Sequence, residues 1–149
     1  MNRYVDDLHI GEKFEVGSVV VEEHELLSFA RRFDPQPMHV DREAAAKGPF
    51  GDLIASGWHT AALVMKLNAE AHILGDTPVL GMGVEKIEWP VPVRAGDTIR
   101  AVTEVTGIRP SKSKPDFGII NFTTTAYNQR GEVVFVAHPN VWAPRRPVQ

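Results

Sequence analysis

The spacing of apolar residues changes near the middle of the chain, from helical periods to the alternation typical of strands. Residues 14–21 end in three valines and predict a strand. Across residues 22–33, apolar side chains recur every three or four positions, which predicts an amphipathic helix. Glutamates open this segment and arginines close it, as the helix dipole favours. The chain therefore begins with one strand followed by one helix.

Two more helices are predicted before the change of period. Asp41 stands where an N-cap belongs and predicts a short helix through Ala46, which Gly48 stops. A longer helix is predicted from Gly57 to about Leu74, and its segment 61–65 is apolar on every side. Because a helix that is apolar all round buries most of its surface, we expect this one to lie in the core.

The second half of the chain predicts four long strands, over residues 79–93, 98–109, 117–128 and 132–142. Turn residues separate them, so they form one antiparallel sheet with hairpin links. A sheet of this kind can curl around the preceding helix and cover it. The sequence thus predicts an α+β hotdog fold, a long antiparallel β-sheet wrapped around a central, largely buried α-helix. We expect residues 1–149 to form a single domain, with a frayed tail from residue 144.

Composition narrows the classes of function. Hydrophobic residues make up 43% of the 149 residues and charged residues 23%, which is typical of a soluble globular protein. The net charge of −3 argues against nucleic acid as a partner. The absence of cysteine excludes disulfides and thiolate chemistry. No signal peptide and no apolar run of membrane length is present, so we expect no membrane association and a cytoplasmic location.

The candidate chemistry lies in the segment 34–41, where Asp34 and His39 stand five residues apart. On a continuous helix the two side chains would point about 140° apart. Pro35 and Pro37 forbid a continuous helix, so the segment must leave the helix near Asp34 and bend. Such a bend can aim a carboxylate and an imidazole at one water, as a general acid–base pair. Alternatively, Asp34 ends the helix and His39 satisfies a buried carbonyl.

The same segment carries a resemblance to a known family. Several short motifs together resemble the MaoC-like dehydratases, which include (R)-specific enoyl-CoA hydratases. These motifs are Phe29-Ala30, Asp34, Pro37, His39, Asp41, Phe50-Gly51, residues 55–57 and residues 92–98. Two positions depart from the family pattern: Gln36 replaces the usual Asn, and Ser56 replaces the common His. The resemblance spans most of the chain and is far more specific than an Asp–His spacing.

The resemblance implies reversible hydration of a trans-2-enoyl thioester, with Asp34 and His39 as catalytic residues. It also implies that the backbone amide of Gly57 stabilises the enolate oxygen, at the start of a helix where anions are favoured. Alternatively, Gly57 is glycine only because close packing requires it. Gln36 and Ser56 are candidates for substrate binding. No metal and no other cofactor is expected.

A locally basic loop supplies further candidates, namely Arg109, Ser111, Lys112 and Lys114. They would hold the phosphates or the pantetheine arm of coenzyme A, or they form a solvated turn. The expected partner is an acyl-CoA or an acyl-carrier-protein thioester. Because an open sheet edge invites pairing, we expect a homodimer or a dimer of dimers. The alternatives are a hotdog acyl-CoA thioesterase and a non-catalytic acyl-thioester-binding protein.

Overall fold

The computed structural model describes residues 1–148 of the chain. In this part of the chain the elements follow one another in this order: η1 (a 3-10 helix, Val5–Asp7), β1 (Lys13–Val20), α1 (Glu23–Phe33), α2 (Pro37–Val40), α3 (Arg42–Lys47), α4 (Gly57–Glu70), β2 (Leu80–Glu88), β3 (Thr98–Pro110), β4 (Phe117–Tyr127) and β5 (Val133–Pro144).

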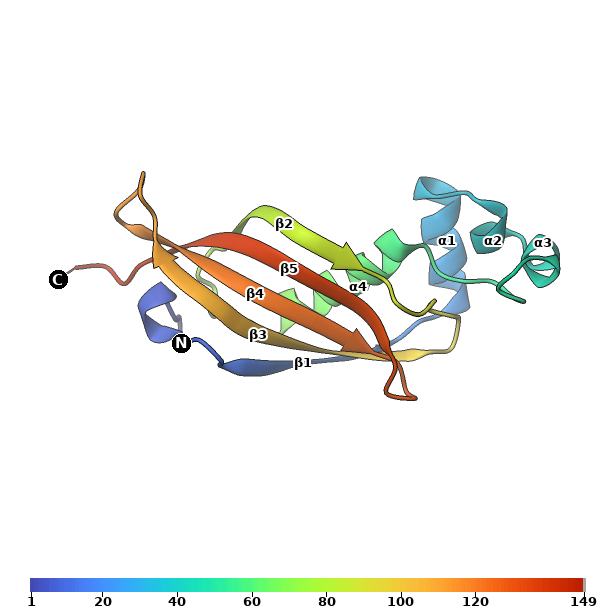
Figure 1. The fold of residues 1–149 in the computed structure, drawn as a ribbon, viewed down its shortest axis with the longest axis horizontal. Coiled ribbons are helices and arrows are strands. Elements are labelled where there is room, and N and C mark those ends of the chain that lie inside the picture. The colour runs from blue at the N-terminus through green and yellow to red at the C-terminus, as the bar shows by residue number, and fades with distance from the viewer. Residues whose placement is uncertain (149) are drawn as a thin grey trace.

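The five strands form one antiparallel sheet in the order β1-β3-β4-β5-β2. The sheet curves past α4, while α1, α2 and α3 gather beyond one end of it, beside the start of α4 (Figure 1). This arrangement confirms the predicted α+β hotdog fold. The strands β1 and β2 are the two edges of the sheet.

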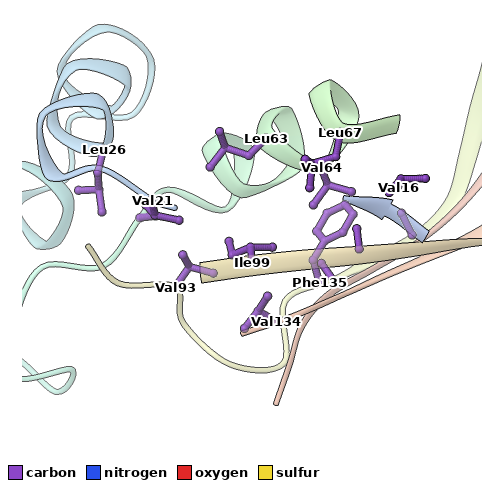
Figure 2. Packing of buried hydrophobic residues seen from close by; sticks show 14 residues of the cluster. Val16, Val21, Leu26, Leu63, Val64, Leu67, Val93, Ile99, Val134 and Phe135 are labelled. Atoms are coloured by element: carbon purple, nitrogen blue, oxygen red, sulfur yellow. The ribbon is translucent and has the colours of Figure 1, made fainter. Parts of the chain in front are cut away.

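The main core lies between α4 and the concave face of the sheet. Leu63, Val64 and Leu67 of α4 point towards Ile99 of β3 and Phe135 of β5 (Figure 2). Val21, which follows β1, and Leu26 of α1 close one end of this core, and both are almost completely buried. Burial of each such side chain stabilises the fold by roughly 1.5–3 kcal/mol. This core fixes the position of α4 and therefore of its N-terminus.

Two predicted boundaries differ from the structure by more than two residues. The helix α4 ends at Glu70 rather than near Leu74, and a turn follows in which His72 adopts a positive φ of 48°. The strand β2 ends at Glu88 rather than at Val93. Its prolines explain this end, because Pro90 and Pro92 have no N–H to give to a neighbouring strand.

The helix α4 is less enclosed than its apolar sequence predicts. His59, Thr60, Leu63, Val64 and Leu67 are buried against the sheet and α1. The opposite face is open in the single chain, where Trp58 is 59% exposed and Met65 is 67% exposed. Across residues 1–148, none of the helices combines the length and the apolar character that crossing a bilayer requires.

Candidate active site

The structure contains the predicted bend after α1, and the bend includes a short helical turn that the prolines did not predict. The helix α1 ends at Phe33, and Asp34 follows as its C-cap. The chain then forms a single helical turn, α2, with Pro37 in its first turn. A proline is tolerated there because the first N–H groups of a helix lack a partner in any case. This turn brings His39 back towards Asp34.

Asp34 and His39 form a close pair. The Nε2 atom of His39 lies 3.3 Å from Oδ2 of Asp34. The other ring nitrogen, Nδ1, lies 2.7 Å from the carbonyl oxygen of Ile54. A carbonyl can only accept, so Nδ1 carries a hydrogen, and Nε2 faces the carboxylate. The side chain of His39 is 4% exposed and that of Asp34 is 21% exposed, so the pair reaches solvent on the side of Asp34.

The two residues that depart from the family pattern both donate hydrogen bonds to Asp34. The amide of Gln36 donates to Oδ1 at 2.8 Å, and the hydroxyl of Ser56 donates to Oδ2 at 2.8 Å. These two bonds, with a smaller effect of His39, hold the pKa of Asp34 below its ordinary value. Asp34 is therefore a carboxylate at neutral pH, suited to accept a proton or to orient a water.

The start of α4 lies directly beside this pair. Ser56 is the N-cap residue of α4, yet its side chain caps no amide of the helix because it is bonded to Asp34. Among residues 1–148, the N–H groups of Gly57 and Trp58 have no acceptor. Free amides at a helix N-terminus favour a negatively charged group.

Close packing also requires glycine at position 57. The indole N–H of Trp89 donates to the carbonyl oxygen of Gly57 at 2.8 Å. A Cβ atom on Gly57 would lie 2.8 Å from a ring carbon of Trp89, which is closer than real contacts allow. The packing explanation for this glycine is therefore sufficient, and it leaves the amide of Gly57 free for a ligand.

Surrounding contacts hold the bend in place. Asp41 caps α3 by accepting from the N–H of Ala44 at 3.1 Å, as the sequence predicted. Arg42 bonds to Glu23 of α1 and to Asp52 of the loop after α3. Arg94 donates to the carbonyl oxygen of Phe50 at 2.7 Å. These contacts join α1, α3 and the segment that carries Ile54 and Ser56.

The basic loop lies far from this pair within the single chain. Residues 111–116 connect β3 to β4 at the end of the sheet opposite α1, α2 and α3 (Figure 1). Ser111 is buried, and its hydroxyl accepts from the N–H of Lys114 at 3.2 Å. The ammonium of Lys114 lies 4.7 Å from the ring centre of Trp142. One chain therefore does not bring Arg109, Ser111, Lys112 and Lys114 to Asp34.

Two partners of this site were missed from the sequence. Ile54 contributes a backbone carbonyl, which every residue has, so no side chain could have revealed it. Trp89 lies 32 residues from Gly57, and no local pattern in the sequence connects the two. Within residues 1–148, no three histidine or acidic side chains cluster in a way that could hold a metal ion.

Comparison with known proteins identifies the family of the chain. Residues 7–127 match the family described as MaoC like domain, and the chain belongs to this family of MaoC-like dehydratases. The crystal structure of a MaoC-like dehydratase from Rhodospirillum rubrum is similar to the chain with a TM-score of 0.92 and 41% identity. That similarity covers 98% of this chain and 99% of the other.

Curated relatives of similar length also match. The (R)-specific enoyl-CoA hydratase of Rhodospirillum rubrum is 28% identical over 147 residues, which is 96% of this chain and 93% of the relative. The Bacillus subtilis protein YdeM, described as uncharacterized, is 34% identical over 141 residues, which is 95% of this chain and 99% of the relative.

Proposed function

We propose that the protein is an (R)-specific enoyl-CoA hydratase, or 3-hydroxyacyl-CoA dehydratase, that reversibly adds water to a trans-2-enoyl thioester. The observation that carries this proposal is the convergence of Asp34 and His39 beside the free amides that begin α4. The similarity to the (R)-specific hydratase of Rhodospirillum rubrum supports the same reaction. We expect residues 1–149 to act as one domain in the cytoplasm.

In the proposed reaction, Asp34 and His39 hold the attacking water. Asp34 takes a proton from the water as its oxygen bonds to C3, and the electrons of the double bond move towards the thioester oxygen. His39, starting as an imidazolium whose Nδ1–H is held by Ile54, gives its Nε2 proton to C2. The proton on Asp34 then passes to Nε2 across their 3.3 Å contact, which restores both groups. Each positioned proton transfer contributes roughly 10²–10⁴-fold to the rate.

The Gly57 amide would stabilise the enolate between these two proton transfers. The thioester oxygen gains negative charge when the enolate forms, and donors aimed at that oxygen lower the barrier. In this proposal Gln36 and Ser56 act through Asp34, which both of them contact. They would also border the bound substrate, because they flank the carboxylate that holds the water.

We further propose that the working form is a homodimer or a dimer of dimers. Arg109, Ser111, Lys112 and Lys114 would then contact the phosphates or pantetheine of a thioester bound at the Asp34 of the partner copy. The location of this loop supports the idea, because it lies at the opposite end of its own sheet from α2 (Figure 1). The carrier would be coenzyme A or an acyl carrier protein.

The direct test uses Asp34→Asn and His39→Gln in an absorbance assay with crotonyl-CoA. Each variant should lose at least about 100-fold in kcat/KM, because each removes one proton transfer. Asp41→Asn is the matched control, since asparagine also caps a helix and the side chain of Asp41 accepts its hydrogen bond from the N–H of Ala44, not from a residue of the acid–base pair. A variant at either catalytic position that kept near wild-type turnover would rule the mechanism out. Release of free thiol without hydration would instead indicate a thioesterase.

A further inference from the structure

A second feature of the molecule is a groove of about 650 Å³ between the second half of α4 and the sheet. Its size falls within the range of small-molecule sites. Its walls are mainly apolar and include Met65 of α4, Val84 of β2, Phe122 of β4 and Val141 of β5. Neither Asp34 nor His39 lines it, so the acid–base pair does not account for this space.

The floor of the groove carries a chain of buried polar groups. Thr103 and Thr124 are only 2% and 4% exposed, and their hydroxyl oxygens lie 2.8 Å apart. The hydroxyl of Thr103 donates to Oδ1 of Asn68 at 2.5 Å. Asn68 gives one amide hydrogen to the carbonyl of Val64 at 3.1 Å. One amide hydrogen of Asn68 and an acceptor site on Thr124 are thus left over.

A third buried hydroxyl in the groove has no partner at all. Thr77 lines the groove, is 8% exposed, and its Oγ1 atom bonds to nothing within residues 1–148. Buried polar groups in folded proteins almost always have hydrogen-bond partners. The groove therefore offers unused neutral donors and acceptors within an apolar space.

We propose that this groove holds the far part of the acyl chain, and that Asn68, Thr124 and Thr77 bind a neutral oxygen substituent on it. This inference rests on the proposed thioester chemistry and names its substrate class: enoyl thioesters with a hydroxyl or keto group distant from the double bond. A carboxylate fits less well, because neither lysine nor arginine lines the groove, and the lining residue His72 already has an acidic neighbour, Asp76, at 3.8 Å. A buried charge without a partner is strongly unfavourable.

The exposed face of α4 connects the groove with the acid–base pair. Trp58, Ala62, Met65 and Ala69 are exposed and recur at helical spacing, so they form one stripe along the helix. Met65 follows Gly57 by eight residues, which is about 12 Å along the helix axis. A medium-length acyl chain that starts at the Gly57 amide can follow this stripe and enter the groove at Met65.

The test compares two saturated thioesters that cannot react, decanoyl-CoA and ω-hydroxydecanoyl-CoA, by calorimetric titration of the full-length protein. Wild type should bind the hydroxylated probe about tenfold more tightly, as expected for one or two neutral hydrogen bonds. Asn68→Leu should reduce this preference to about unity. Thr124→Val, which keeps the shape of the side chain, should reduce it in part. Thr125→Val is the matched control, because Thr125 is the next residue of β4 and does not line the groove; this variant should keep the full preference.

The inference would be overturned if wild type bound the two probes with equal affinity. It would also be overturned if wild type bound neither probe. Variants that weakened subunit association and left the preference unchanged would show that a second copy fills the groove. Hydration of trans-2-decenoyl-CoA, measured separately, tests the proposed reaction. A protein that binds the hydroxylated probe selectively without hydrating enoyl thioesters would contradict that reaction but support the groove assignment.

Discussion

Asp34 owes its low pKa mainly to Gln36 and Ser56, the two residues that distinguish this chain from the family pattern. Each of them gives a hydrogen bond to the charged carboxylate. A bond to the charged form favours ionisation, so loss of either donor raises the pKa of Asp34. The two departures therefore preserve the charge that the proposed mechanism needs.

Gln36→Leu should shift the acid limb of the pH profile of kcat/KM to higher pH. Activity is lost as pH falls through the pKa of Asp34, because a protonated carboxyl cannot accept the proton of water. The variant raises that pKa, so activity is lost at a higher pH than in wild type. The measurement is the rate of hydration as a function of pH, at substrate concentrations well below KM. Gln36→Asn retains an amide and is the matched control. An unchanged acid limb in Gln36→Leu would contradict the assignment.

At the scale of residues, the sequence predicted the pairing of Asp34 with His39 but not the contacts that hold the two side chains in place. Two prolines between Asp34 and His39 were enough to predict a bend, because their effect is local. The bond from Ser56 to Asp34 joins residues 22 positions apart and depends on where α4 packs. The Ile54 carbonyl and the Trp89 indole depend on tertiary packing in the same way. Local sequence rules therefore predicted that Asp34 and His39 could meet. The partners that are distant in sequence could be identified only from the folded structure.

At the scale of elements, the contact between α1 and α4 contains a buried histidine. The ring of His59 stacks on Phe29 at 4.9 Å between centroids, with 13° between the planes. Its Nδ1 atom has no partner within residues 1–148. Burial lowers the pKa of His59, and the charge of Glu25 opposes this only partly. The two helices are thus joined through an imidazole that the fold keeps neutral.

As pH decreases below neutrality, the free energy of unfolding should decline more steeply in wild type than in His59→Phe. Below a pH of roughly 6.5 the unfolded chain protonates His59 while the folded chain does not, so stability declines until pH reaches the lowered folded pKa. Each unit of pKa difference corresponds to about 1.4 kcal/mol. Phenylalanine keeps the stack and cannot be protonated. Urea unfolding at neutral and at mildly acidic pH measures the difference.

The exposed His24 of α1 is the matched control for this experiment. The His24→Phe variant should show the wild-type decline in the free energy of unfolding. If His59→Phe declined as steeply as wild type, burial of the neutral ring would not contribute to acid sensitivity.

The periodic pattern of apolar residues predicted every major helix and strand. Its errors concern where an element ends and which of its faces is buried. The helix α4 began at Gly57 as expected, but helical spacing gave no signal for its end at Glu70. The apolar segment 61–65 predicted burial all round, whereas Met65 is largely exposed in the single chain. Sequence periodicity reports which positions are apolar. It does not report whether the chain itself or a second copy covers them.

At the scale of the molecule, one edge of the sheet is apolar and uncovered. The strand β2 is an edge strand, and its exposed side chains include Leu80, Met82 and Val84. Trp58 and Met65 of α4 are exposed as well. An apolar edge strand with free backbone groups is a ready surface for pairing with another chain. These residues support β2 as the edge along which two copies would join.

Lysines at this edge should convert the proposed dimer to monomers. Leu80→Lys combined with Val84→Lys places two charges on β2, where burial against a second copy is unfavourable. Light scattering coupled to size-exclusion chromatography at micromolar concentration gives the mass. Ile10→Lys combined with Val20→Lys is the control, because both residues are exposed away from β2. A monomeric wild type, or a dimer that survived the β2 substitutions, would contradict the proposal.

The position of the hairpin 111–116 at the far end of the sheet from α2 has one consequence for inheritance (Figure 1). If twofold pairing brings each hairpin to its twin's reaction centre, then a lysine lost from one polypeptide damages the other one's turnover. Two differently disabled alleles could then restore each other in a mixed assembly, and the unit on which selection acts would be the pair.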